Sequence, residues 1–437
     1  MIPSPAQFVA HLVAVGHRPA AVVGDWFGHG AVVAPDLVAR PAPLADAFPA
    51  GPEPTDGATA RESAQDSAQS STPWHFGWLP YCPPEVEPAA FAASTRDVVV
   101  FADGEWSIPD GSGVDPEWLT AVLSDAAHAA LPRDPAIEWD AGDRAAHERG
   151  VLDCLEAIRA GDVYQACVST RFHGTITAPE PAPAPAAEPA AEPATPNPTV
   201  RAAAAWWARR VVKHEPVRAA FIAGTGADGR DFVVASLSPE EFLVRDGATV
   251  RESPIKGTIP LSADPAELAA SRKDVAENIM IVDLVRHDLG QVAVTGGVRA
   301  TDLLAVRPAP GVWHLVSEVT AELPDGLPHA DLIDACFPPA SVTGTPKIRA
   351  AELLSEWEPV PRGVHCGAIG ASTGDMLELN VAIRTAEFRA PGSVLHDADA
   401  DAVSVEVGVG GGITIDSDPG AEWAEILAKA APLIDPA

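Results

Sequence analysis

The chain has 437 residues, 47% of them hydrophobic, and a formal net charge of −32, from 29 Lys and Arg against 61 Asp and Glu. This length is enough for one large domain or two ordinary ones. The acidic balance argues against a nucleic-acid or anionic-membrane partner, because phosphate binding requires basic patches. An anionic substrate would need local positive charge from a metal ion or from a few lysines and arginines.

The five cysteines are far apart and include no C-x-x-C pair, so the sequence predicts neither a zinc site nor a disulfide framework. The N-terminal segment lacks a basic region followed by a cleavage site. No run of about 18 apolar residues, the length needed to span a membrane, occurs anywhere. We therefore expect a cytoplasmic protein.

Two stretches differ in composition from a folded core, residues 43–73 and residues 177–199. The second is rich in Pro, Ala and Glu and cannot bury enough apolar surface to offset the entropy of ordering it. We expect a flexible loop in the first stretch and a surface insertion in the second. Residues 1–144 contain strand patterns but little chemistry, so we expect them to form a divergent N-terminal part of the fold.

From about residue 145 the pattern becomes more regular. A helix is predicted to end near Gly161, and a strand that includes Gln165 follows it. Asp264 and Pro265 open one long predicted helix, roughly residues 265–289. Asp418 and the proline after it open a C-terminal helix. Between these helices lie strand signals typical of antiparallel pairing, in the segments AAFIAG, DFVVASLS, EEFLVRD and TVRESPI. Strands grouped together with helices packed on them indicate an α+β fold.

The C-terminal helix carries Glu422, Glu425 and Lys429 at i, i+3 and i+7, which places all three on one face. This spacing also fits a solvated, salt-bridged surface. The preceding strand runs into Gly410–Gly412, where the missing side chains would let a ligand approach backbone amides. We therefore regard this end of the chain as a candidate ligand site.

Three further residues are candidates for chemistry. Glu277 lies in an apolar stretch of the long helix and could join the two later glutamates as an oxygen ligand of Mg²⁺, or could be an exposed helix acid. Lys256 becomes a nucleophile if its surroundings favour the free amine, although its setting also fits an ordinary surface lysine. Glu240 could act as a general acid or could cap a turn.

These residues belong to eight segments that occur in a fixed order: SLSPEEF, ESPIKGT, KDVAENIMIVDLVRHDLG, HLVSEV, FPPASVTGTPKIRA, CGAIG, LNVAIRT and GVGGGITIDSDPGAEWAEILAK. Together they closely resemble the chorismate-utilising family, which includes anthranilate, aminodeoxychorismate, isochorismate and salicylate synthases. The resemblance covers roughly residues 145–437, which we therefore expect to be the chorismate-binding catalytic domain.

The resemblance implies a large α/β sandwich of antiparallel sheets that encloses a site for Mg²⁺ and chorismate. Glu277, Glu422 and Glu425 match the metal-binding acids of the family. Arg384 matches the arginine that binds the enolpyruvyl carboxylate, and His365 stands where a tyrosine is usual, although imidazole can still donate a hydrogen bond. The positions that match substrate-binding residues are Arg384, His314, Thr343, His365, Gly410, Gly411, Gly412, Lys429 and Gln165.

Two positions indicate which branch of the family the chain resembles. Isochorismate- and salicylate-forming members carry a lysine base where this chain has Gln165, and an amide cannot be that base. Aminodeoxychorismate synthases carry a lysine at the centre of P-I-x-G-T, as here at Lys256, where anthranilate synthases generally have alanine. The resemblance implies that Lys256 adds to C2 of chorismate while Glu240 helps the C4 hydroxyl to leave. Ammonia from a separate glutamine amidotransferase subunit then enters at C4, giving 4-amino-4-deoxychorismate, the precursor of p-aminobenzoate in folate synthesis.

Two alternatives stay open at this point. A sister activity, above all anthranilate synthesis by an anthranilate synthase component I, would use the same fold and most of the same residues. A degenerate chorismate-binding subunit would bind without turnover. The sequence therefore predicts a chorismate-aminating transferase, and the reaction product separates it from both alternatives.

Overall fold

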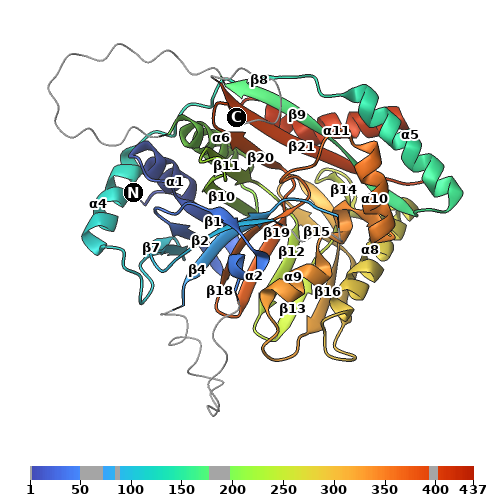
Figure 1. Cartoon of the computed structure of the whole chain (residues 1–437), viewed down its shortest axis with the longest axis horizontal. Helices are drawn as coiled ribbons and strands as arrows, with labels where there is room; N and C mark the ends of the chain where they lie inside the picture. Colours follow the sequence, from blue (N-terminus) through green and yellow to red (C-terminus); the bar gives the residue numbers. More distant parts are fainter. Residues whose placement is uncertain (1, 50–71, 84–88, 177–196, 393–401) are drawn as a thin grey trace.

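Two large antiparallel β-sheets form the centre of the molecule, with helices on their outer faces (Figure 1). The predicted α+β sandwich is thereby confirmed. No helix in the described part of the chain is both long and apolar enough to cross a membrane. This computed structural model describes residues 2–49, 72–83, 89–176, 197–392 and 402–437.

Among the described residues, sheet A has eleven strands and sheet B has ten. Sheet A runs in the order β17 (Gly344–Thr345), β9 (Gln165–Ile176), β21 (Val403–Ile413), β20 (Thr385–Arg389), β11 (Asp231–Ser236), β10 (Arg218–Thr225), β1 (Ala20–Trp26), β2 (His29–Ala34), β6 (Val99–Ala102) and β7 (Glu105–Ser107), with β8 (Glu138–Trp139) paired to β9. Sheet B runs in the order β14 (Ile255–Pro260), β16 (Val312–Glu322), β13 (Thr249–Glu252), β12 (Glu241–Asp246), β19 (Met376–Val381), β18 (Ala368–Thr373), β4 (Trp74–Leu79), β5 (Ala90–Thr95) and β3 (Arg40–Ala42), with β15 (Arg299–Ala309) paired to β16.

The N-terminal part of the chain completes both sheets. Strand β1 pairs with β10 in sheet A, and β4 pairs with β18 in sheet B. Both pairings are antiparallel, as are those of the strands that the sequence predicted. Residues before and after position 145 therefore share one framework.

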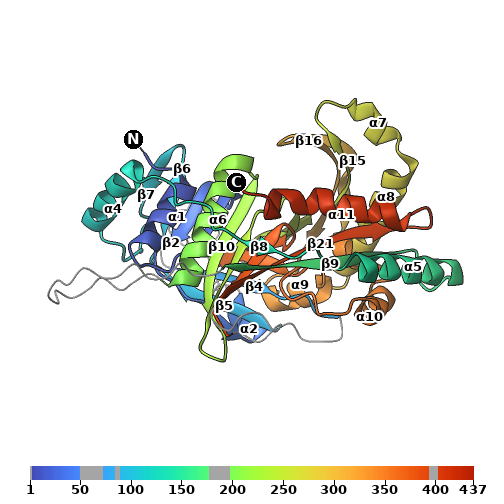
Figure 2. The same cartoon turned by 90° about the horizontal axis from the view of Figure 1, so that it is seen from above.

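The helices cover the two outer faces (Figure 2). On the side of sheet A lie α1 (Pro5–Ala14), α4 (Pro116–His128), α5 (Arg144–Ala160), α6 (Pro198–His214) and α11 (Pro419–Ile434). On the side of sheet B lie α2 (Leu44–Ala47), α7 (Pro265–Ala270), α8 (Arg272–Gly290) and α9 (His329–Cys336). The short 3₁₀ turn η1 (Ala340–Val342) and α10 (Lys347–Trp357) contact β9.

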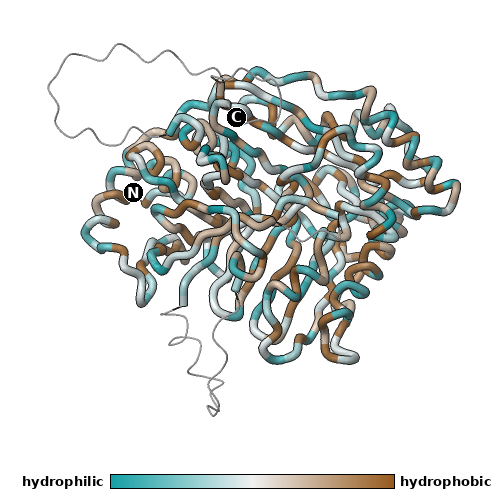
Figure 3. The backbone as a smooth tube through the Cα atoms, in the orientation of Figure 1, coloured by the Kyte–Doolittle hydropathy of each residue, from teal (hydrophilic) through white to brown (hydrophobic). Residues whose placement is uncertain are grey.

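The first half of strand β1 is buried on both faces, which explains why its sequence there is a continuous apolar run. Its side chains alternate, so Ala20 and Val22 face the layer between the sheets while Ala21 and Val23 face the helices. Both faces are buried, and in Figure 3 apolar residues occur along the strands as well as along the helices. Apolar side chains fill only one part of the layer between the sheets. In another part, strands β9, β21 and β14 border a cavity.

The single helix predicted over residues 265–289 is wrong. The structure has two helices, α7 and α8, separated at Ser271, whose backbone is extended and whose hydroxyl accepts a hydrogen bond from the backbone N–H of Asp274. Serine competes for backbone groups in this way and starts a new helix as its N-cap. In α8 the residues Ile281, Val282, Val285 and Leu289 are buried, whereas Ile279 is exposed.

Other predicted helix ends are confirmed. Helix α5 ends at Gly161, which adopts a left-handed conformation with φ 84°. Asp264 and Asp418 cap α7 and α11 through their side-chain oxygens. These caps satisfy backbone N–H groups that the first turn of a helix leaves without a partner.

At the edges of the two predicted loops the chain is folded. Residues 43–49 include α2, and Phe48 is fully buried. Asn197 caps α6 by accepting hydrogen bonds from two backbone N–H groups. The predicted loop and insertion therefore extend too far at these ends, and most of both lies outside the described residues.

We predict that the Trp207→Ala variant loses about 3–5 kcal/mol of unfolding free energy. Trp207 is fully buried on α6, where its ring packs 5.6 Å from that of Phe221 and its indole N–H donates to the Ser236 carbonyl. Chemical denaturation measures the loss. The control is Val212→Ala, an exposed position of the same helix, where a change below about 0.5 kcal/mol is expected. Equal losses in both variants would contradict the assignment of Trp207 to the core.

Candidate active site

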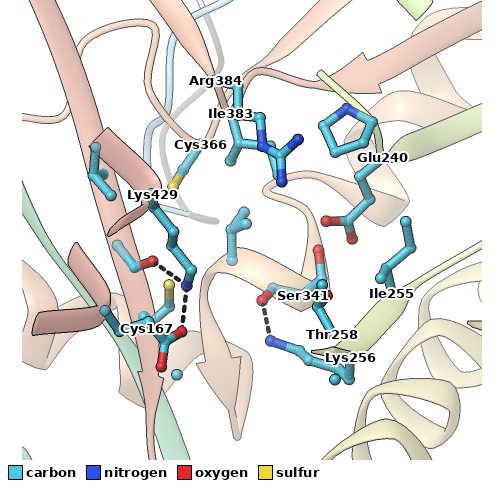
Figure 4. Close-up of a pocket in the computed structure, with 18 of the residues that line it drawn as sticks. Cys167, Glu240, Ile255, Lys256, Thr258, Ser341, Cys366, Ile383, Arg384 and Lys429 are labelled. Carbon is cyan, nitrogen blue, oxygen red and sulfur yellow. Dashed lines mark hydrogen bonds and ion pairs between the residues drawn. The ribbon is translucent and has the colours of Figure 1, made fainter. Parts of the chain in front are cut away.

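A cavity of about 490 Å³ lies where strands β9 and β21 of sheet A approach strand β14 of sheet B. Most of the residues predicted from the sequence line it, although they come from distant parts of the chain. Those that line it are Glu240, Lys256, Glu277, His314, His365, Arg384, Gly410, Gly411, Gly412, Glu425 and Lys429. Figure 4 shows four of these side chains, Glu240, Lys256, Arg384 and Lys429, around one space.

Lys256 is directed into the cavity by a β-bulge. Between Ile255 and Thr258 the pairing of β14 with β16 shifts by one residue, and Gly257 has a φ of 83°. A side chain at Gly257 would contact Asp274 at 2.9 Å, so the turn requires glycine. The Lys256 ammonium donates to the backbone carbonyl of Ser341 at 2.8 Å.

Glu240 faces the same space from the segment just before β12 (Figure 4). Burial raises the pKa of Glu240 above its ordinary value, although a hydrogen bond with the Ser341 side chain and the charge of Lys256 act in the opposite direction. A raised pKa keeps a carboxyl group protonated to higher pH. Glu240 can therefore hold a proton for transfer inside the cavity.

Arg384 and His314 form another part of the wall. The Arg384 guanidinium projects into the cavity and has neither a hydrogen bond nor an ion pair within the described residues (Figure 4). His314, on β16, shares a hydrogen bond of 2.8 Å between its Nδ1 and the Thr258 hydroxyl. Burial, assisted by the charge of Arg384, lowers the pKa of His314 to about 4. The imidazole is therefore neutral, and the arginine is available for an anion.

Two of the three predicted metal-binding acids lie close together. Glu277 on α8 and Glu422 on α11 are both buried, and each has a carboxylate oxygen 3.9 Å from the ammonium of Lys273. The Oε1 atom of Glu277 is buried without a hydrogen-bond partner among the described residues. Burial raises the pKa of Glu277, while Lys256 and Lys273 act to lower it.

The third acid, Glu425, is paired differently. Its carboxylate lies 2.7 Å from the Lys429 ammonium, which also donates to the Gly410 carbonyl at 2.9 Å. Burial acts to raise the pKa of Glu425, but Lys429 and the other cavity lysines bring it below its ordinary value. Within the described residues, no three His, Cys, Asp or Glu side chains are close enough to hold a metal ion by themselves.

The three predicted glycines continue strand β21 and pair with β9, so they are part of the sheet. Strand β20 pairs with β21 only as far as Val407. Beyond it, alternate backbone groups of β21 have no strand partner within the described sheet. Side chains at Gly411 and Gly412 would come within 3.3 Å of Glu422 and 3.6 Å of Glu277. Gly411 therefore leaves close room for Glu422, whereas the distance at Gly412 is that of an ordinary contact.

His365 packs closely on the same strand. A side chain at Gly408 would lie 2.2 Å from the imidazole, so this contact requires glycine. Both ring nitrogens of His365 are buried without hydrogen-bond partners in the described structure. Burial, with contributions from Arg362, Arg171 and Lys429, lowers the pKa of His365 well below its ordinary value. The ring is therefore neutral and has one donor and one acceptor to offer.

Gln165 and Thr343 do not line the cavity. Gln165 begins β9 and is buried, with its amide oxygen unpartnered among the described residues. The Thr343 hydroxyl donates to the Pro339 carbonyl, and its backbone carbonyl accepts from Cys167. Thr343 thereby contacts Cys167, which does line the cavity.

Sequence reasoning missed several residues that line the cavity: Cys167, Thr258, Lys273, Asp274, Ser341 and Cys366. Lys273 and Ser341 are the most informative of these, because they contact predicted residues. Lys273 lies four positions before Glu277, a spacing that places two residues on one helix face and could have revealed it. Ser341 carries no such signal, since its contacts join distant segments.

We predict that His314 titrates near pH 4, as its buried position implies. The unfolded chain takes up this proton near the ordinary value of 6.5, so the unfolding free energy falls as the pH drops from 6.5 toward 4. An NMR titration of the imidazole measures the midpoint, and the His314→Asn variant identifies its signal. A midpoint near 6.5 would show that the ring is not desolvated.

Known proteins with similar sequences include chorismate binding enzymes. The pattern of the chorismate binding enzyme family matches residues 114–435. Aminodeoxychorismate synthase component 1 of Escherichia coli (strain K12) is 37% identical over 283 residues, which cover 63% of this chain and 53% of that protein. Anthranilate synthase component 1 of Neisseria meningitidis (strain MC58) is 35% identical over 215 residues, covering 47% and 41%.

Among solved structures, anthranilate synthase component I from Streptococcus pneumoniae has the same fold, with a TM-score of 0.64 and 22% sequence identity. The match covers 95% of this chain and 92% of that one. The chain spans about half the length of the curated relatives it matches. Because the family pattern covers most of the sequence, including nearly every residue of the cavity, this chain belongs to the chorismate binding enzymes.

Proposed function

We propose that this chain is an aminodeoxychorismate synthase component 1, which converts chorismate and ammonia to 4-amino-4-deoxychorismate. The observation that carries the proposal is the position of Lys256, whose amine faces one cavity together with Glu240 and Arg384. Curated relatives named aminodeoxychorismate synthase component 1 are 37–43% identical over the matched segments, which supports the same reading.

Lys256 and Glu240 suit a two-step amination. In the first step Lys256, after its ammonium loses a proton to water, forms a bond to C2, the ring double bond shifts, and the C4 hydroxyl leaves as water with a proton from Glu240. In the second step ammonia bonds to C4, the double bond shifts back as the bond from C2 to Lys256 breaks, and the Glu240 carboxylate takes a proton from the new C4 ammonium group, which restores both residues. The raised pKa of Glu240 suits the acid role, and the Lys256 contact with Ser341 fixes where the amine lies.

The charged groups of the cavity suit a dianionic substrate. Arg384 has no competing anion among the described residues and can bind one carboxylate through a bidentate hydrogen bond. Neutral His314 and His365 can each donate a hydrogen bond without adding charge. A substrate carboxylate thereby meets positive charge inside a protein whose net charge is −32.

The acids Glu277 and Glu422 fit a magnesium ion. The unpartnered, buried Oε1 of Glu277 lacks a cation at hydrogen-bond distance, and Mg²⁺ is commonly bound by one or two carboxylates with water and substrate oxygens. Bound there, the ion would neutralise the ring carboxylate of chorismate. Glu425 would have to leave Lys429 to join them. These two buried acids would hold the ion, and Gly411 of β21 leaves close room beside Glu422.

Ammonia would come from a glutamine amidotransferase subunit, as the designation of the relatives as a component suggests. The product would supply p-aminobenzoate and folate synthesis. The cytoplasmic location expected from the sequence stays a prediction. Anthranilate synthesis is the second candidate, since anthranilate synthase components also match the chain at about 35% identity, but those enzymes generally lack the lysine at position 256.

We expect the purified chain to form aminodeoxychorismate from chorismate, Mg²⁺ and an ammonium salt, without any partner protein. Liquid chromatography with mass spectrometry identifies the product, and an added lyase converts it to p-aminobenzoate. Omission of ammonium is the control. Anthranilate or salicylate as the main product would refute the proposal, and chorismate binding without turnover would favour a degenerate subunit.

Replacing Lys256 with methionine should reduce this amination by about 100-fold or more, because no other amine would take over the covalent step. Lys256→Arg keeps a positive charge but provides a poor nucleophile, so it should be similarly inactive. The matched control, Lys213→Met, removes a lysine of α6 that does not line the cavity and should keep wild-type turnover. Wild-type rates in Lys256→Met would remove the covalent role.

A further inference from the structure

Lys273 lies between two acids that come from different parts of the molecule. It projects from α8, and its ammonium is 3.9 Å from Oε1 of Glu277 on the same helix and 3.9 Å from Oε1 of Glu422 on α11. The two helices lie at the same end of the molecule (Figure 2). A single cation is thus equidistant from both carboxylates.

The contacts of Lys273 are attractive but loose. At 3.9 Å an ammonium interacts with a carboxylate through charge, yet it is too far away for a hydrogen bond. Glu277 Oε1 accordingly has no hydrogen-bond partner in the described structure. The lysine side chain is 47% exposed, whereas the Glu277 and Glu422 side chains are 9% and 7% exposed. The acids are therefore fixed and buried, and the lysine head group is the part that can move.

We infer that Lys273 is an internal counter-cation, which neutralises Glu277 and Glu422 in the metal-free protein and must move away when a divalent cation binds between them. The inference rests on the proposed function, which assigns Mg²⁺ to these two acids. Two cations cannot share the gap, since their mutual repulsion in a partly desolvated site is strong. The flexible, half-exposed lysine stem can turn its ammonium into the solvent of the cavity at small cost.

Lys273 then decides how tightly the free enzyme binds magnesium. Each magnesium ion that binds must displace two ion pairs, so the lysine weakens the apparent affinity and prevents the acids from repelling each other when the metal is absent. Lys429 plays a parallel part for Glu425, which it contacts at 2.7 Å. In the metal-free protein, the ammonium groups of Lys273 and Lys429 thus provide the positive charge that the metal would otherwise supply.

The test is a Mg²⁺ titration of the full chain by calorimetry, without chorismate. Lys273→Met keeps the aliphatic stem and removes the charge. Arg272→Met is the matched control, because it removes one positive charge from the neighbouring exposed position of α8, which does not line the cavity. We expect the dissociation constant for Mg²⁺ to fall at least about threefold in Lys273→Met relative to Arg272→Met.

Thermal unfolding gives a second readout that does not depend on turnover. Without metal, Lys273→Met should unfold at a lower temperature than Arg272→Met, because two buried carboxylates lose their counter-cation. Saturating Mg²⁺ should reduce that difference, since the ion replaces the missing charge. Lys273→Gln provides a polar alternative should the methionine variant fold poorly.

Three results would overturn the inference. Mg²⁺ binding in Lys273→Met that is unchanged or weaker than in Arg272→Met would show that the lysine does not compete with the ion. A raised KM for chorismate with an unchanged Mg²⁺ affinity would assign Lys273 to substrate binding. Wild-type protein that binds no Mg²⁺ would remove the site itself, while product analysis with ammonium would still decide separately whether the chain aminates chorismate.

Discussion

The pairing of β21 with β9 is the interaction on which the site depends. It runs over eleven residue pairs, from Val403 opposite Ile176 to Ile413 opposite Ala166. Because side chains alternate along a strand, a slip of one residue would exchange the faces of both strands. The register sets Gly410–Gly412 against the cavity and brings the chain directly into α11, which carries Glu422, Glu425 and Lys429.

Electrostatics then explains how an acidic protein can provide a site for an anion. Lys256, Lys273, Arg384 and Lys429 line one cavity, although Lys and Arg are outnumbered about two to one by Asp and Glu in the whole chain. Their contacts differ in kind. Lys429 is bound to Glu425 and a carbonyl, Lys273 is loosely held by two acids, and Arg384 is unpaired among the described residues. Lys429 therefore helps to hold the site together, whereas the Arg384 guanidinium is available to a ligand.

The fold alone does not decide the reaction. A similar fold is seen in structures named as an anthranilate synthase component and as isochorismate synthases, at 17–22% sequence identity, and one fold can carry different reactions. In this chain the bulge at Lys256 and Gly257 directs an amine into the cavity, and Gln165 does not line it. The backbone of β14 sets the position of Lys256, and that of β9 sets the position of Gln165.

The sequence by itself determined the antiparallel strands, the caps at Asp264 and Asp418, and the set of segments that carry the chemistry, because periodicity, capping and motif order are local properties of a chain. Only the tertiary structure decided which side chains meet. It brought Lys273 of α8 next to Glu422 of α11, and it placed the Lys256 ammonium against the Ser341 carbonyl. Those choices depend on how α8, α11 and the two sheets pack together, and the distances that result are not encoded in any local pattern.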